Sequence, residues 1–146
     1  MVVHDEFIHA SVWEGMRLSR VSSTIPFAHN CVRSLRSVLE GVKKKNGDVR
    51  QGRRNVFVAV EGLYSMDGDL APLKEIVEAV EELFPLGNGL CVVDEAHSTG
   101  IYGRKGRGLV SEMGLEGRFF ARLHTFGKAM GCNGGMSALL LLPFAR

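Results

Sequence analysis

The hydrophobic positions of the chain fall into two kinds of segment, one with helical spacing and one with a continuous apolar run. Four segments are helix candidates: residues 9–19, a segment after Asn30, residues 72–84 and residues 107–113. In the second segment the apolar residues Val32, Leu35, Leu39 and Val42 have helical spacing, and Asn30 is placed to cap it. The clearest of these is residues 72–84, where apolar side chains form one stripe and a proline occupies the first turn. We expect a helix in each of these segments.

Short apolar runs between these segments predict strands. Residues 55–60 and 90–93 are rich in β-branched side chains, as expected of strands buried on both faces, and further candidates are residues 119–123 and 137–142. The basic segment 43–54 contains two glycines and is expected to be a solvated loop. Strands that alternate with helices indicate an α/β fold with a mostly parallel sheet flanked by helices.

The composition suits one globular domain or a piece of a larger one, with 146 residues of which 45% are hydrophobic. A net charge of +2 argues against a dedicated nucleic-acid binder. The sequence contains neither a membrane-spanning run nor a signal-peptide pattern, so we expect a cytoplasmic protein and leave organelle targeting open.

Cysteine and histidine usage suggests neither a disulfide framework nor a metal site. The cysteines are odd in number and widely spaced, which is typical of a reducing compartment, and no CxxC pair occurs. We expect Cys31, Cys91 and Cys132 to be buried apolar residues, and His9 and His29 to be structural.

Polar residues follow three of the predicted strands. Ser65 lies after the first, Asp94 and His97 after the second, and Thr125 and Lys128 after the third. Open parallel sheets bind ligands at the carboxyl ends of their strands, so we expect these side chains to gather at one edge of the sheet.

Residues 94–97 spell DEAH, the letters of a helicase box. A helicase motor also needs a phosphate-binding loop of the pattern GxxxxGK[ST], and the sequence contains none. The single Gly-Lys pair, Gly127-Lys128, is followed by alanine. We therefore reject the motor and look for other chemistry in Asp94 and His97.

The chemistry of these residues fits a pyridoxal phosphate site. Asp94 ends an apolar strand, and a buried carboxylate there needs a cationic partner such as a protonated pyridine nitrogen. Lys128 lies among small residues, where its amine could react with an aldehyde, and the hydroxyl of Thr125 could bind a phosphate. The alternatives are that Lys128 is an ordinary surface charge and that Ser65 is only a turn residue before the helix at 72–84.

Longer motifs around these residues resemble one family of enzymes. The segments are EGLYSMDGDLAPL, DEAHSTGIYGRKGRG and HTFGKAMGCNGG, and together they resemble the α-oxoamine synthases, pyridoxal-phosphate enzymes of fold type I. FIHASVWEGMRLSR and FAHNCVRSLRSVL are similar to the family's preceding segments, so the resemblance covers nearly the whole chain.

The resemblance implies a role for each candidate site residue. Lys128 matches the lysine that binds the cofactor aldehyde, and Asp94 matches the acid that pairs with the pyridinium nitrogen. His97 and Ser65 match residues that contact the phenolic oxygen of the ring, and Thr125 matches the phosphate-binding threonine. We therefore predict Lys128, His97 and Asp94 as the catalytic residues, and we expect no metal ion at the site.

The activity implied by the resemblance is a decarboxylating condensation of an amino acid with an acyl-coenzyme A. The motif TFGKAMGCNGG is most similar to that of 8-amino-7-oxononanoate synthases of biotin biosynthesis, which use L-alanine and a pimeloyl thioester. The alternatives are 2-amino-3-ketobutyrate ligase, 5-aminolevulinate synthase, a serine palmitoyltransferase-like enzyme, or a non-catalytic remnant or partner subunit. The family also implies a homodimer, without nucleic-acid or membrane partners.

Residues 1–146 correspond, by the same resemblance, to the central part of the family's large, cofactor-binding domain. The upstream phosphate loop, the aromatic residue that stacks on the pyridine ring, and the small C-terminal domain with its carboxylate-binding arginine have no counterpart here. We expect the 146-residue chain alone to be inactive and to aggregate through unpaired sheet edges.

Overall fold

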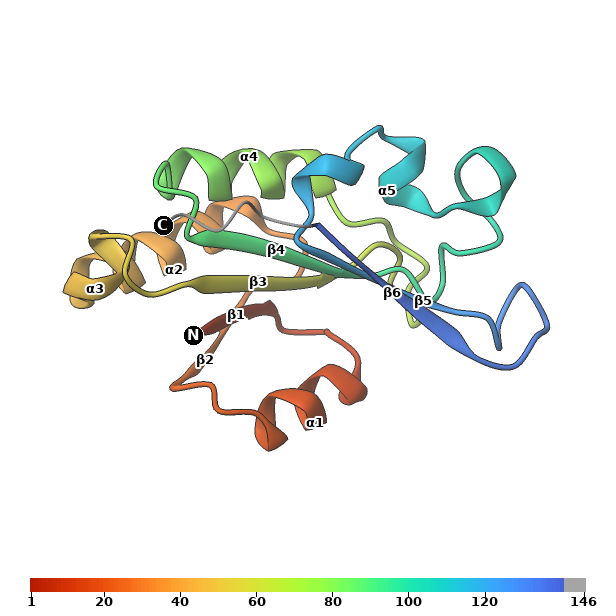
Figure 1. Ribbon diagram of the computed structural model, residues 1–146, viewed down its shortest axis with the longest axis horizontal. Coiled ribbons are helices and arrows are strands. Elements are labelled where there is room, and N and C mark those ends of the chain that lie inside the picture. The colour runs from red at the N-terminus through yellow and green to blue at the C-terminus, as the bar shows by residue number, and fades with distance from the viewer. Residues whose placement is uncertain (141–146) are drawn as a thin grey trace.

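The computed structural model describes residues 1–140, which form one six-stranded sheet with helices on both faces (Figure 1). The strand order is β2-β1-β3-β4-β5-β6. The strands are β1 (Val2–Asp5), β2 (Thr24–Phe27), β3 (Val56–Glu61), β4 (Gly89–Asp94), β5 (Ala121–Thr125) and β6 (Gly135–Leu139). All neighbouring strands are parallel except β5 and β6. This confirms the predicted α/β class with a mostly parallel sheet.

The helices divide the apolar core between the two faces of the sheet. They are α1 (Ala10–Leu18), α2 (Val32–Lys45), α3 (Gly47–Arg50), α4 (Leu73–Leu83) and α5 (Leu109–Glu112), with 3₁₀ turns at Arg104–Gly106 and Glu116–Arg118. Helices α2, α4 and α5 lie on one side and α1 on the other (Figure 1). On the α4 side, Leu39, Ile76 and Val58 belong to the larger core cluster, while Met16 of α1 packs with Val2 in a smaller one.

The strongest sequence patterns are confirmed. Helices α1, α4 and α5 lie within the predicted segments, and α2 follows Asn30 as expected. Strands β3 and β4 match residues 55–60 and 90–93 to within a residue, whereas β5 begins two residues later than predicted. Helix α4 buries Leu73, Ile76 and Val80, as its apolar stripe indicates.

Strands β1 and β2 were not predicted. Each has only four residues, and β1 includes His4 and Asp5, which are fully buried although polar. Strand β2 contains Pro26, which is tolerated because β2 is an edge strand. Short strands with polar or proline residues lack the pattern from which strands are predicted.

The predicted solvated loop at residues 43–54 is wrong for residues 43–50 and confirmed for residues 51–54, which form turns and bends. Helix α2 continues to Lys45, and α3 follows directly, capped by the side-chain oxygen of Asn46. Val49 of α3 is only 1% exposed, so one apolar residue in a basic segment suffices to dock this turn on the core. The predicted cap of α2 is also wrong, because Cys31 occupies the N-cap position and the Asn30 side chain contacts Asp69 instead.

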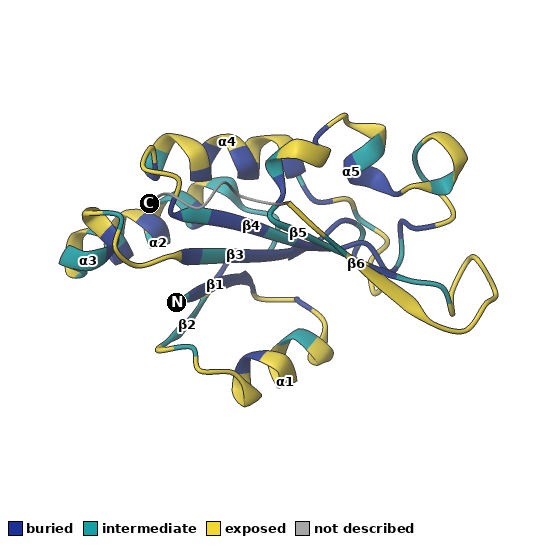
Figure 2. Ribbon diagram, in the orientation of Figure 1, coloured by how far each residue is buried: buried dark blue, intermediate teal, exposed yellow. Residues whose placement is uncertain are grey.

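The last strand and the cysteines also differ from expectation. Strand β6 begins at Gly135, is antiparallel, and is largely exposed (Figure 2), while residues 141–142 of the predicted strand lie outside the described residues. All three cysteines are free, but only Cys91 is buried; Cys31 is half-buried and Cys132 is exposed. Among residues 1–140, no helix is both long enough and apolar enough to cross a membrane.

Candidate functional site

The carboxyl ends of β3, β4 and β5 bring the predicted catalytic residues together. Asp94 ends β4, and the loops after β4 and β5 carry His97 and Lys128. Their side chains meet, with 2.7 Å between Lys128 Nζ and His97 Nε2. Residues 31 positions apart in the chain are therefore neighbours because β4 and β5 are paired in parallel.

Asp94 has the environment expected of an acid that binds a cation. The residue is 8% exposed, and Oδ1 accepts a hydrogen bond of 2.9 Å from the backbone N–H of Ala96. Within residues 1–140 this carboxylate makes no second hydrogen bond, so Oδ2 can accept from a cationic donor. Because a buried carboxylate without a partner is costly, this geometry fits a protonated ring nitrogen.

The His97 ring lies between Lys128 and the carboxyl group of Glu61. Its Nε2 faces Lys128, and its Nδ1 lies 3.7 Å from Oε2 of Glu61. Burial and the nearby Lys128 ammonium both lower the pKa of His97 below its ordinary value. The imidazole is therefore neutral near pH 7, with one nitrogen able to donate and the other able to accept.

Glu61 is a site residue that the sequence analysis missed. It ends β3 in direct register with Asp94, and it is buried at the same edge of the sheet. Burial and the Asp94 charge raise the pKa of Glu61 to about 7, since two neighbouring carboxylates resist being ionised together. Its position after an apolar run, which is the same as that of Asp94, is the signal that could have identified it.

Ser65 and Thr125 lie at this edge without joining the Lys128–His97 contact. Ser65 is exposed in the loop after β3 and lines a cavity of about 570 Å³ together with Glu61 and Tyr64. Thr125 is the last residue of β5 and is half-buried. Within residues 1–140, no hydrogen bond links either hydroxyl to Lys128 or His97.

A third buried carboxylate, Glu95, fixes the turn that carries His97. Its Oε1 accepts hydrogen bonds from the backbone N–H of Val110 (2.9 Å) and the hydroxyl of Ser98 (3.2 Å). Its Oε2 lies 3.7 Å from Nε2 of His124, whose pKa is lowered by burial. Glu95 thus ties the turn after β4 to α5 and β5, and this holds Asp94 and His97 in place.

We expect Gly108→Ala to destabilise the protein by roughly 1–3 kcal/mol. Alanine is strained at a positive φ, and its methyl group would overpack the site. Gly108 has a φ of 102°, and a Cβ there would collide with the Glu95 carboxylate. Gly41→Ala is the matched control, because Gly41 lies inside α2 with open space at its Cβ position. The control should stabilise the helix by roughly 0.5–1 kcal/mol.

Urea unfolding of both variants measures these changes. It is done in the full gene product, meaning these residues with any sequence that flanks them in the gene. Unfolding midpoints that shift equally in the two variants would contradict the proposed packing of Gly108 on Glu95.

The chain is similar in sequence to a known protein family and to several individual proteins. A family model described as aminotransferase class I and II matches residues 1–139. The 8-amino-7-oxononanoate synthase of Emericella nidulans is 53% identical over 136 residues, which are 93% of this chain and 33% of that protein. The aminoacyl transferase sphA of Byssochlamys spectabilis is 41% identical over 92% of this chain and 29% of its own length.

Solved structures give a consistent result. Serine palmitoyltransferase from S. paucimobilis, with a bound PLP–myriocin aldimine, is 34% identical with a TM-score of 0.79, over 94% of this chain and 31% of that chain. Another serine palmitoyltransferase structure with PLP has the same TM-score at 35% identity. These likenesses confirm the predicted fold type and the resemblance to α-oxoamine synthases. The chain spans about a third of the length of the relatives it matches.

Proposed function

We propose, because the chain belongs to the family of class I and II aminotransferases, that it forms part of the pyridoxal phosphate site of an α-oxoamine synthase. The observation that carries the proposal is the convergence of Asp94, His97 and Lys128 at one edge of the sheet. As a piece of such an enzyme, residues 1–146 correspond to the central part of its large domain.

The residues present fit the cofactor. Pyridoxal phosphate supplies an electron sink when bound, and it needs a lysine, an acid and phosphate-binding groups. Lys128 would hold it covalently through Nζ, and Oδ2 of Asp94 would accept from its ring nitrogen. His97 and Ser65 would contact its phenolic oxygen, and Thr125 its phosphate.

The reaction proposed is the condensation of L-alanine with a pimeloyl thioester, with loss of carbon dioxide. The relative named 8-amino-7-oxononanoate synthase, at 53% identity, favours these substrates over others in the family. The serine palmitoyltransferase structures favour the alternative of L-serine with a longer acyl chain. We propose a cytoplasmic homodimer that binds neither nucleic acid nor membrane.

The alternative to an enzyme is a non-catalytic partner subunit. The presence of Lys128, and its contact with His97, supports a catalytic protein instead, because an inactivated partner needs no lysine at the position that would bind the cofactor aldehyde.

Release of free thiol from acyl-coenzyme A tests the proposed function. We expect the full gene product, with pyridoxal phosphate, to release thiol from pimeloyl-coenzyme A and L-alanine. Faster release with palmitoyl-coenzyme A and L-serine would favour the serine palmitoyltransferase-like alternative. No release with any family substrate pair, together with no cofactor binding, would reject the proposal.

A further inference from the structure

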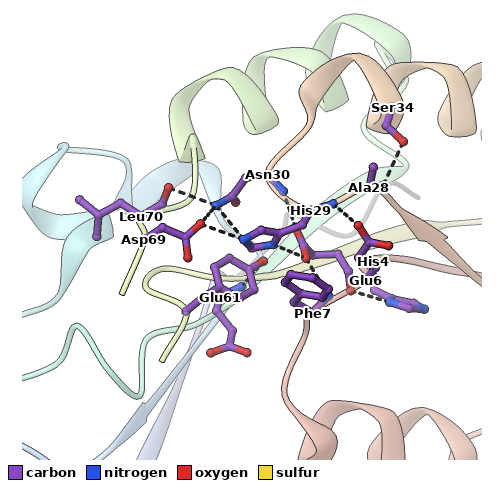
Figure 3. A network of polar contacts seen from close by, with 12 residues as sticks. His4, Glu6, Phe7, Ala28, His29, Asn30, Ser34, Glu61, Asp69 and Leu70 are labelled. Carbon is purple, nitrogen blue, oxygen red and sulfur yellow. Dashed lines mark hydrogen bonds and ion pairs between the residues drawn. The ribbon is translucent and has the colours of Figure 1, made fainter. Parts of the chain in front are cut away.

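The loops that follow β1, β2 and β3 meet at one histidine, His29 (Figure 3). Its Nδ1 lies 2.8 Å from Oδ1 of Asp5, the last residue of β1. Its Nε2 lies 2.8 Å from Oδ2 of Asp69, in the loop before α4. We call Asp5, His29, Asn30 and Asp69 the His29 cluster.

Both carboxylates of the His29 cluster are already fixed as acceptors. The side chain of Asp5 is 1% exposed and accepts hydrogen bonds of 2.9 Å from the backbone N–H groups of Phe7 and Asn30. Asp69 accepts from the side-chain amide of Asn30. Asp5 and Asp69 can accept from both ring nitrogens of His29 only when each nitrogen carries a proton, so this geometry favours the imidazolium form of the ring.

A third carboxylate, Glu6, contacts the backbone of His29. Glu6 approaches from the β1 side, where Oε1 accepts a hydrogen bond of 2.8 Å from the His29 backbone N–H. Burial alone would lower the pKa of His29, but hydrogen bonds and charges from Asp5 and Asp69 outweigh it and raise the pKa above 6.5. The stabilisation from the cluster is thus complete below pH 6.5 and is lost as the pH rises through the folded-state pKa.

The faces of the His29 ring support the wall of the cavity that contains Ser65. Phe7 stacks on the ring with 4.6 Å between centroids, and Tyr64 meets it edge-on, also at 4.6 Å. Phe7 and Tyr64 both line the cavity of about 570 Å³ beside Glu61 and Ser65. The Tyr64 hydroxyl accepts a hydrogen bond of 3.2 Å from the Glu61 backbone N–H. Tyr64 therefore links the His29 ring to the end of β3.

We propose that His29 is a positioning residue for the cofactor site, because as a cation between Asp5 and Asp69 it holds the Phe7–Tyr64 wall and the Ser65 loop in place. This inference rests on the proposed function. It adds that the site loosens when His29 loses its proton, although His29 itself contacts no proposed cofactor-binding side chain in the described part of the chain.

The test compares wild type with His29→Gln and Asp69→Asn in the full gene product. We expect His29→Gln to weaken the dissociation constant for pyridoxal phosphate roughly tenfold at slightly acidic pH, since hydrogen bonds to charged groups are worth that much. The difference from wild type should shrink as the pH rises through the titration of His29, because the ring then loses its charge. Asp69→Asn removes one charge from a half-exposed side chain, so this variant should fold even if His29→Gln does not. Its affinity for pyridoxal phosphate should fall less than that of His29→Gln, and the loss should also shrink as the pH rises.

A readout that needs no cofactor accompanies the titration. The melting temperature of the cofactor-free wild type should fall as the pH rises through the His29 titration, and both variants should flatten this dependence. Arg17→Gln is the control, because it removes an exposed ion pair with Glu14 and should leave both profiles unchanged.

Each outcome decides a separate question. Variants that bind pyridoxal phosphate as tightly as wild type at every pH would overturn the inference alone. A wild type that binds no pyridoxal phosphate at any pH would overturn the proposed function and this inference with it, even if the melting profiles show a charged His29.

Discussion

Lys128→Ala is expected to abolish both covalent attachment of pyridoxal phosphate and thiol release by the full gene product. Lys128 is the lysine that lies at the shared edge of β4 and β5, with Nζ 2.7 Å from a neutral His97. Alanine leaves no amine there, so the aldehyde of the cofactor has nothing to bond. The visible absorbance band of the bound cofactor should disappear, and borohydride should no longer attach the label to the protein.

Peptide mapping after borohydride reduction of the wild type checks the position of the link. The label should be on Lys128, and Lys74→Ala should behave as wild type, because Lys74 is exposed on α4. A label on Lys74 or Lys105 would show that Lys128 is an ordinary surface charge.

Asp94→Asn is expected to slow removal of the substrate α-proton by roughly 10²–10³-fold, because a charge that stabilises the transition state is lost. Binding of the cofactor should weaken much less. The asparagine keeps an oxygen for the Ala96 N–H, so the turn after β4 should keep its shape. Exchange of the α-proton of L-alanine in heavy water, followed by NMR, measures the chemical step directly.

The same variant has a second, independent effect. The Asp94 charge contributes to the raised pKa of Glu61, so Asp94→Asn should lower the pKa of Glu61. Asp48→Asn, far away in α3, is the control and should change neither the rate of α-proton exchange nor the pKa of Glu61. Normal α-proton exchange in Asp94→Asn would make Asp94 a structural residue.

The sequence alone determined the elements whose apolar pattern is uninterrupted and the side chains that directly follow them. Residues 55–60, 72–84 and 90–93 were predicted because a buried strand or an amphipathic helix needs such runs wherever it lies in the fold. Asp94 and Lys128 were predicted as site residues for the same reason, since polar residues just past buried strands lie at the edge where open parallel sheets bind ligands.

Tertiary structure alone decided which polar residues are buried in pairs. His4 and Asp5 make β1 look unlike a strand, yet β1 lies inside the sheet, and Asp5 is satisfied by His29, 24 positions away. Glu61 acquires its raised pKa only because β3 and β4 pair in register and place it beside Asp94. Such partners come from distant parts of the chain, and a local pattern contains no information about them, because hydrogen bonds and charges depend on distance in space rather than along the sequence.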